Sequence, residues 1–241
     1  MLHATKGIVL RTVKYGETSI VVTIYTELFG LQSYLMNGVR TDKKSGTKAN
    51  LFQPTTMLDL VVYHHPHKNL QRIKEAKIFE ARNSQGTDVV KYTISIYMVE
   101  LIQKAITETE PNSELYHFFE ESFLHVLLGK ETSLANFPIA FTLSLAEHMG
   151  FTIQNNYSEQ TPFFNLQNGN FVHENDSFNI YRVEKENSFI ISEILNDGTK
   201  QPGITGNKRL EILNICIQYL RLHIPHLGEL KSVQVLHETL N

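Results

Sequence analysis

Cysteine is almost absent from the 241-residue chain, which has a single one, Cys216. A lone cysteine cannot form a disulfide within the chain, and it cannot supply the several thiolates of a cysteine-rich zinc site. Because its neighbours Ile215 and Ile217 are apolar and the segment is predicted to be helical, we interpret Cys216 as a buried, inert thiol. The composition therefore excludes a disulfide-rich secreted scaffold.

Long apolar runs and a signal peptide are also lacking. No stretch of about 18 apolar residues occurs, which is close to the length that a membrane-spanning helix needs. The first residues, MLHATKGIVLR, have neither the apolar core nor the small-residue cleavage site of a secretory leader. We therefore expect a cytoplasmic protein without membrane contact. Its 41% of hydrophobic residues suffices for one large domain or two modest ones.

A basic surplus, the usual mark of a nucleic-acid-binding protein, is missing when the chain is counted as a whole. Its 22 basic and 25 acidic residues give a net charge of −3. The two parts differ, however. Residues 1–80 contain 11 basic and 6 acidic residues, a charge of +5, and residues 81–241 contain 11 and 19, a charge of −8. The average therefore hides a basic N-terminal part and an acidic remainder.

The first 80 residues change character about every ten residues, which is the spacing of short strands. Turn signals at Gly16, Gly30 and Asn37-Gly38 separate runs that are rich in β-branched residues. Five antiparallel strands in so short a segment hide their edges by closing into a small barrel, and the count fits an OB-type barrel. We predict strands at residues 3–12, 19–26, 31–36, 56–63 and 70–79.

After about residue 82 the spacing of apolar residues changes to that of helices. Helices are predicted at residues 87–109, 113–129, 133–148, 188–195 and 207–223, with a late start or a kink at Pro138. Residues 151–187 lose this period, which predicts an irregular insertion with a short hairpin at 163–172. The predicted fold class is a multidomain β-then-α protein, with a five-stranded OB-fold domain at residues 1–81 and a mostly α-helical domain at residues 82–241.

The basic residues of the predicted barrel lie on its first strand, the following turn and the long connection at 39–50, which flank the binding groove of an OB barrel. Such barrels bind single strands through basic grooves for phosphates and aromatic side chains for base stacking. A solvated surface is the alternative explanation of the charge. The candidate nucleic-acid contacts are Lys6, Arg11, Lys14, Arg40, Lys43, Lys44 and Lys48. The candidate stacking residues, with half-buried structural rings as the alternative, are Tyr15, Tyr25 and Tyr34.

Three histidines in the sequence YHHPH, at residues 63–67, are the nearest approach to a metal motif. They leave open a metal-dependent hydrolase built on His64, His65 and His67, although a zinc site also needs partners that orient each imidazole. The proline and the position between two predicted strands favour an exposed loop instead. No Gly-rich phosphate loop, nucleophile elbow or HExxH motif occurs. We therefore predict no catalytic residue, no cofactor and no metal.

The sequence KGIVLRTVKYGETSIVVTIYTELFG, at residues 6–30, resembles the N-terminal signature of the RecO recombination mediator proteins. NGVR, QP and LDLVVY follow in the same order as in that family, and LAEHMGF and FFNLQNGNFV resemble its C-terminal domain. The resemblance implies an OB domain followed by a helical domain, and a protein that makes and breaks no chemical bond. It further implies binding of single- and double-stranded DNA, strand annealing, contact with the single-strand-binding protein, and, with RecR, help in loading the RecA recombinase during repair.

One departure from the family pattern concerns metal. Some RecO-like proteins hold a four-cysteine zinc site after the third helix, whereas residues 151–187 contain no cysteine. We infer that this insertion folds without metal, through aromatic and apolar contacts of Phe151, Phe163, Phe164 and Phe171.

Three basic residues on or near the last long predicted helix stand beside apolar side chains in the acidic part of the chain. They are Lys208, Arg209 and Arg221. Bacterial single-strand-binding proteins typically end in an acidic tail with a phenylalanine, which basic groups and an apolar pocket would receive together. We therefore consider these residues a candidate docking site for that tail. An OB-fold module that binds RNA or only proteins is the remaining alternative function.

Overall fold

The computed structural model describes residues 1–39, 50–79, 88–107, 109–130, 134–175, 180–197 and 203–240. The chain divides into two compact units, Met1–Thr87 with Val99–Leu128 and Asp88–Met98 with Gly129–Asn241. One boundary between them therefore falls inside the helix α2, Val89–Ala105. The domain division between residues 81 and 82 stays a prediction.

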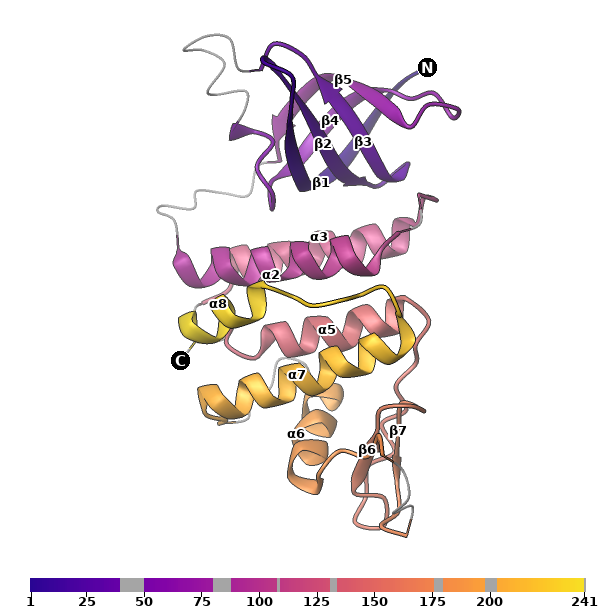
Figure 1. Ribbon diagram of the computed structural model, residues 1–241, viewed down its shortest axis with the longest axis vertical. Helices are drawn as coiled ribbons and strands as arrows, with labels where there is room; N and C mark the ends of the chain where they lie inside the picture. Colours follow the sequence, from indigo (N-terminus) through magenta and orange to yellow (C-terminus); the bar gives the residue numbers. More distant parts are fainter. Residues whose placement is uncertain are drawn as a thin grey trace. The chain divides into compact units, whose positions relative to one another are not determined.

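The first unit contains a closed barrel of five strands, as predicted (Figure 1). The strands are β1 Leu2–Tyr15, β2 Ser19–Thr26, β3 Gly30–Met36, β4 Met57–Tyr63 and β5 Leu70–Ile78, in the order β1-β2-β3-β5-β4. The expectation that all neighbours are antiparallel was wrong, because β3 and β5 run parallel. Strand directions cannot alternate all the way around a ring with an odd number of members, so a closed barrel of five needs one parallel pair.

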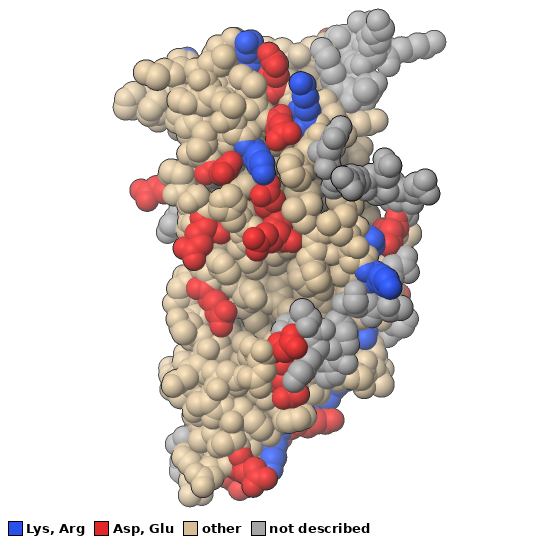
Figure 2. Space-filling view, turned by 180° about the vertical axis from the view of Figure 1, so that it is seen from behind, with Lys and Arg blue, Asp and Glu red and all other residues tan. Residues whose placement is uncertain are grey.

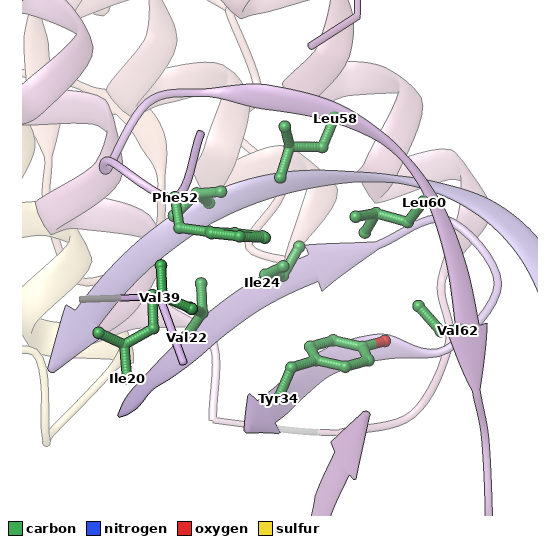
Figure 3. Close-up of a cluster of buried hydrophobic side chains, with 10 residues drawn as sticks. Ile20, Val22, Ile24, Tyr34, Val39, Phe52, Leu58, Leu60 and Val62 are labelled. Carbon is green, nitrogen blue, oxygen red and sulfur yellow. The ribbon is translucent and has the colours of Figure 1, made fainter. Parts of the chain in front are cut away.

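Alternate side chains of the strands fill the barrel (Figure 3). Gly7 faces inward between them, and a Cβ there would lie 2.6 Å from the Ile24 side chain, so only glycine fits without a shift. Val39 and Phe52 add their side chains to the same core, although both lie outside the strands. The buried core residues are Val9, Ile20, Val22, Ile24, Tyr34, Val39, Phe52, Leu58, Leu60 and Val62.

Helix α3, Ser113–Leu128, packs on the outside of the barrel. The ring of Phe119 meets that of Tyr25 edge-on at 5.1 Å, and Glu120 pairs with Lys6 of β1 at 2.9 Å. The segment that leads into α3 presses on the β2–β3 turn, where Gly30 lies against the backbone of Glu110. These contacts join barrel and helix into one unit.

The second unit is mostly helical. Its main helices are α5 Phe137–His148, α6 Lys185–Asn196, α7 Gly206–His223 and α8 Ser232–Thr239. Helix α5 begins only one residue before Pro138, so the late start is confirmed and no interior kink is needed. Helix α7 has buried residues on more than one side, and Cys216 is buried in it as predicted, which raises the pKa of its thiol to about 12. Helix α8 was not predicted.

The insertion that precedes α6 contains the predicted hairpin, β6 Phe163–Asn165 and β7 Asn170–Val172. Phe164 and Phe171 pack against each other across it at 5.1 Å, and Phe164 also meets Tyr219 of α7 at 5.8 Å. The Asn156 side chain accepts from the Phe171 N–H at 2.8 Å and donates to its carbonyl at 2.9 Å. Aromatic packing and amide side chains therefore hold this part of the chain together.

Candidate nucleic-acid interface

The outer face of the β1–β2 hairpin is covered at one end and open at the other. Ile8 and Tyr25 lie opposite each other on this face and both are buried, and the Tyr25 ring packs against Phe119 of α3. Beyond an irregularity in register between Val9 and Arg11, the same face of β1 becomes exposed, starting at Arg11. A ligand can therefore reach the second half of β1 without displacing α3.

A line of outward side chains continues from there across the barrel. Residues that pair directly between neighbouring strands point to the same face of a sheet, so the register identifies the line. Because neighbouring strands lie about 4.8 Å apart, the line extends roughly 19 Å around the barrel. We call it the outer row. Its members, in the order β1, β2, β3, β5 and β4, are Val13, Val21, Leu35, Arg72 and Tyr63.

Three basic side chains border or belong to the outer row. Arg11 lies one outward position before Val13 on β1, and Arg72 is a member of the row. Lys14 pairs with Ile20 of the core and therefore stands at the rim of the barrel. All three are exposed, and within the described part of the chain no carboxylate forms an ion pair with them.

The tyrosines predicted to stack on bases divide into exposed and buried ones. Tyr15, at the end of β1, is 57% exposed. Tyr25 lies under α3 and Tyr34 lies inside the barrel, with 1% and 0% of their surface exposed, and burial raises the pKa of each to about 12. The expectation that Tyr25 and Tyr34 stack on bases was therefore wrong, because no ligand reaches their rings. Tyr63 is a further exposed tyrosine, at 42%.

The other side of the barrel holds basic side chains that have acidic neighbours. Lys6 bonds Glu120, which raises the Lys6 pKa, and its ammonium lies 4.7 Å from the centre of the Phe79 ring. Lys77 stands opposite Asp59 on the neighbouring strand. A groove of about 370 Å³ between these residues has acidic walls as well as basic ones. Seen from behind, the barrel accordingly carries basic and acidic side chains side by side (Figure 2).

Arg40, Lys43, Lys44 and Lys48 lie outside the described residues. The residues that flank this segment are fixed at the rim of the barrel near Lys14. The Val39 N–H donates to the Thr18 carbonyl at 2.9 Å, and the Thr12 hydroxyl donates to the Phe52 carbonyl. Both ends of the basic segment are therefore attached beside the exposed half of β1.

The three histidines between β4 and β5 do not converge. His64 points inward and stacks on Phe29 with ring centres 3.9 Å apart, whereas His65 and His67 are exposed in the turn. Among the residues that the structure describes, no three His, Cys, Asp or Glu side chains are placed to share a metal ion. The hydrolase alternative therefore has no assembled site on these histidines.

The three basic residues of α7 lie at its two ends. Lys208 is held by Glu186 at 2.9 Å and Glu211 at 3.1 Å, near the start of the helix. Arg221 lies about 20 Å further along the helix than Lys208, at the rise of 1.5 Å per residue, and donates to the Gly228 carbonyl. The three cations therefore do not form one site.

Arg209 is placed differently from its neighbour. Its guanidinium donates to three uncharged oxygens, those of Asn136 at 2.9 Å, Leu240 at 2.7 Å and Ile204 at 3.5 Å. It also lines a narrow apolar pocket between α5, α7 and α8, with Leu213 among the apolar walls. Burial lowers the pKa of this guanidinium. A positive group therefore stands in an apolar wall with no carboxylate among its three hydrogen-bond acceptors.

Two family models match the chain. The model described as Recombination protein O N terminal matches residues 1–82, and the model described as Recombination protein O C terminal matches residues 86–159. The chain belongs to the RecO family of DNA repair proteins. The resemblance found in the sequence is thereby confirmed.

Relatives of full length support the family membership. Proteins named DNA repair protein RecO from Christiangramia forsetii and Bacteroides fragilis are 32% and 31% identical to this chain over 241 residues, and each alignment covers 99% of both chains. The protein of that name from Azobacteroides pseudotrichonymphae is 29% identical over 244 residues and covers both chains completely. None of the helices described for this RecO-family chain is long and apolar enough to span a membrane.

Two residues of the outer row, Tyr63 and Arg72, were missed as candidates in the sequence. Both lie on strands that were predicted, but only the pairing of β4 with β5 shows that they face each other and continue the line from β1. Acidic neighbours in the sequence do not separate the two faces, because Lys6 has none nearby whereas Arg72 has Glu75 three positions further on. Only the pairing register of the strands shows which basic residues of the barrel lie on the outer row and which lie on the opposite face.

Proposed function

We propose that this chain binds DNA strands on the outer row of its barrel and acts as a mediator in DNA repair and recombination. In this proposal it anneals complementary single strands, also binds duplex DNA, and works in the cytoplasm without making or breaking a bond. With RecR it helps to load RecA on strands that the single-strand-binding protein covers. The mediator role in this proposal comes from the family resemblance, and the DNA-binding surface is the exposed outer row of the barrel.

One observation supports the proposal most directly, namely the sorting of basic residues between two faces of the barrel. Arg11, Lys14 and Arg72 border exposed apolar and aromatic side chains and have no acidic partner among the described residues. Lys6 is instead committed to Glu120. Phosphates need unpaired cations, and bases need apolar or aromatic surface, so the outer row offers both.

Two double variants test this assignment with the same change in net charge. Arg11→Glu/Arg72→Glu reverses two cations at the outer row, and Lys74→Glu/Lys77→Glu reverses two on β5 that have acidic neighbours. Loss of two phosphate contacts should flatten the dependence of log affinity on log salt by about 1.4 for a single strand, since each contact contributes about 0.7. We expect this change, with slower annealing, only in the first variant.

The measurement is fluorescence anisotropy of a labelled single strand over a series of salt concentrations. Annealing of complementary strands, bare and coated with single-strand-binding protein, is followed in parallel. Equal losses in the two double variants would show that total charge matters rather than the outer row. Unchanged binding and annealing in both would remove the DNA-binding role of this face. Charge reversal at Arg40, Lys43, Lys44 and Lys48 extends the test to the remaining proposed contacts.

Docking of the acidic tail of the single-strand-binding protein belongs to the same proposal, centred on Arg209 rather than on all three cations of α7. Arg209 combines a guanidinium that no described carboxylate neutralises with apolar walls between α5, α7 and α8, and the pocket there, of about 10 Å³, would have to widen to admit the phenyl ring of such a tail. Arg209→Ala is expected to weaken binding of a synthetic tail peptide. Arg221→Ala, at the far end of α7, is the matched control.

A further inference from the structure

The turn between β4 and β5 is a rigid structure. The Lys68 N–H donates to the His65 carbonyl at 3.0 Å and closes a four-residue β-turn with Pro66 in its second position, where proline fits best. Gln71 braces this turn from β5. Its side-chain oxygen accepts from the His65 N–H at 3.0 Å, and its amide donates to the carbonyls of His65 at 2.9 Å and Lys68 at 2.6 Å. Because Gln71 is 98% buried, the brace is itself fixed.

This turn presents nitrogen-bearing side chains to solvent. His65, His67 and Lys68 are all exposed, whereas His64 is turned away from them onto Phe29. A fixed backbone that carries exposed cations binds an anion at low entropic cost, since little of it has to be ordered on binding.

The turn is also continuous with the outer row. Tyr63 immediately precedes it on β4, and Arg72, directly opposite Tyr63, follows it on β5. No carboxylate in the described part of the chain pairs with His65 or His67, so protonation would add uncompensated charge at the end of the row. The charged and titratable groups around the turn are the Met1 amino group and His3 of β1, His64 and Lys68 of the turn itself, and Arg72 of β5.

We propose that the β4–β5 turn binds phosphate groups of the DNA strand that crosses the outer row, and that it binds them more tightly when His65 and His67 are protonated. This inference rests on the proposed function and adds a second binding element with its own pH dependence. Histidine is the residue type whose charge most often changes between about pH 5 and pH 8, so acidification within this range is the condition that tests the inference.

The experiment compares three full-length proteins: the unsubstituted chain, His65→Gln/His67→Gln, and His173→Gln/His226→Gln. The last variant removes two exposed histidines of the other unit, one of which also adjoins a proline. The probe is a labelled thymidine homopolymer, whose bases do not titrate in the range used. Its affinity is measured over a salt series at about pH 8 and about pH 6, on either side of the ordinary histidine pKa. Circular dichroism verifies that each protein is folded at both pH values.

We expect the salt dependence of the unsubstituted protein to steepen by up to about 1.4 on acidification, which corresponds to two added phosphate contacts on a single strand. The His173→Gln/His226→Gln control should behave in the same way, and the His65→Gln/His67→Gln variant should lose the increment while it still binds at about pH 8. An equal pH response in all three proteins, or none in any, would overturn the inference and leave DNA binding by the outer row intact. Absence of binding at both pH values would overturn the proposed function as well.

Discussion

Replacement of Gly30 by alanine would test how the barrel and α3 are joined. Gly30 begins β3 with a φ of 59°, a backbone conformation that side chains rarely adopt. A Cβ at this position would lie 2.9 Å from the carbonyl carbon of Glu110, closer still to its oxygen, and 3.1 Å from the Thr109 oxygen. These are backbone atoms, so no side-chain rotation relieves the clash.

The expected loss of stability has two parts. The left-handed conformation costs an alanine about 1–2 kcal/mol relative to glycine. The clash with the backbone ahead of α3 adds about 1–3 kcal/mol, as for other overpacked sites. Gly16 is a matched control, because its φ is 62° but nothing lies within 4 Å of a Cβ there. The effect of alanine on the unfolded chain is common to both variants and cancels in the comparison.

The free energy of unfolding of both variants is measured by urea titration, and amide hydrogen exchange locates the loss. Gly30→Ala should be less stable than Gly16→Ala by about 1–3 kcal/mol. Exchange should accelerate in β2, β3 and α3, where the contact lies. If Gly16→Ala loses as much stability, the clash with Glu110 contributes nothing and the reasoning is refuted.

Three further predictions concern the barrel. Burial, aided by nearby positive groups, lowers the pKa of His64, so the folded state favours the neutral ring. The free energy of unfolding should therefore fall as the pH drops below about 6.5. Urea titrations of His64→Gln over the same pH range should show a smaller fall. Tyr15→Ala should weaken oligonucleotide binding between about 5-fold and 150-fold if one base stacks on this ring. Tyr92 of α2 is similarly exposed, and its replacement by alanine should leave the affinity measured by anisotropy unchanged. The Lys6–Glu120 pair should show a coupling energy below about 1 kcal/mol in a double-mutant cycle, since the Lys6 side chain is 37% exposed, and a much larger value would contradict this assignment.

Much of the architecture was predictable from the sequence, because β-branched runs and turn residues mark strands locally. Pairing was not predictable in full. The parallel contact of β3 with β5 follows from closure of the ring, which no single segment encodes. Helix α8 was missed because Ser232–Thr239 is only eight residues long, little more than two turns, and so shows little periodicity.

The candidate site was predicted only in part, since residue type alone does not show which face a side chain occupies. Tyr25 and Tyr15 look equivalent in the sequence, yet α3 covers the first and leaves the second exposed. Lys6 likewise differs from Arg11 only through Glu120, which lies 114 positions away in the chain. Burial and pairing of this kind depend on distant segments and become visible only in the folded chain.

The two buried side chains that flank the basic segment, Val39 and Phe52, have a practical consequence for engineering. Each is 1% exposed, so each anchors one end of the segment in the barrel core. Doubling the length of a loop costs only about 0.6 kcal/mol of closure entropy when its ends are fixed in this way. Extra residues or a spectroscopic tag inserted between the anchors should therefore leave the barrel intact. The attachment points would stay beside Lys14 and allow DNA arrival to be observed from that rim.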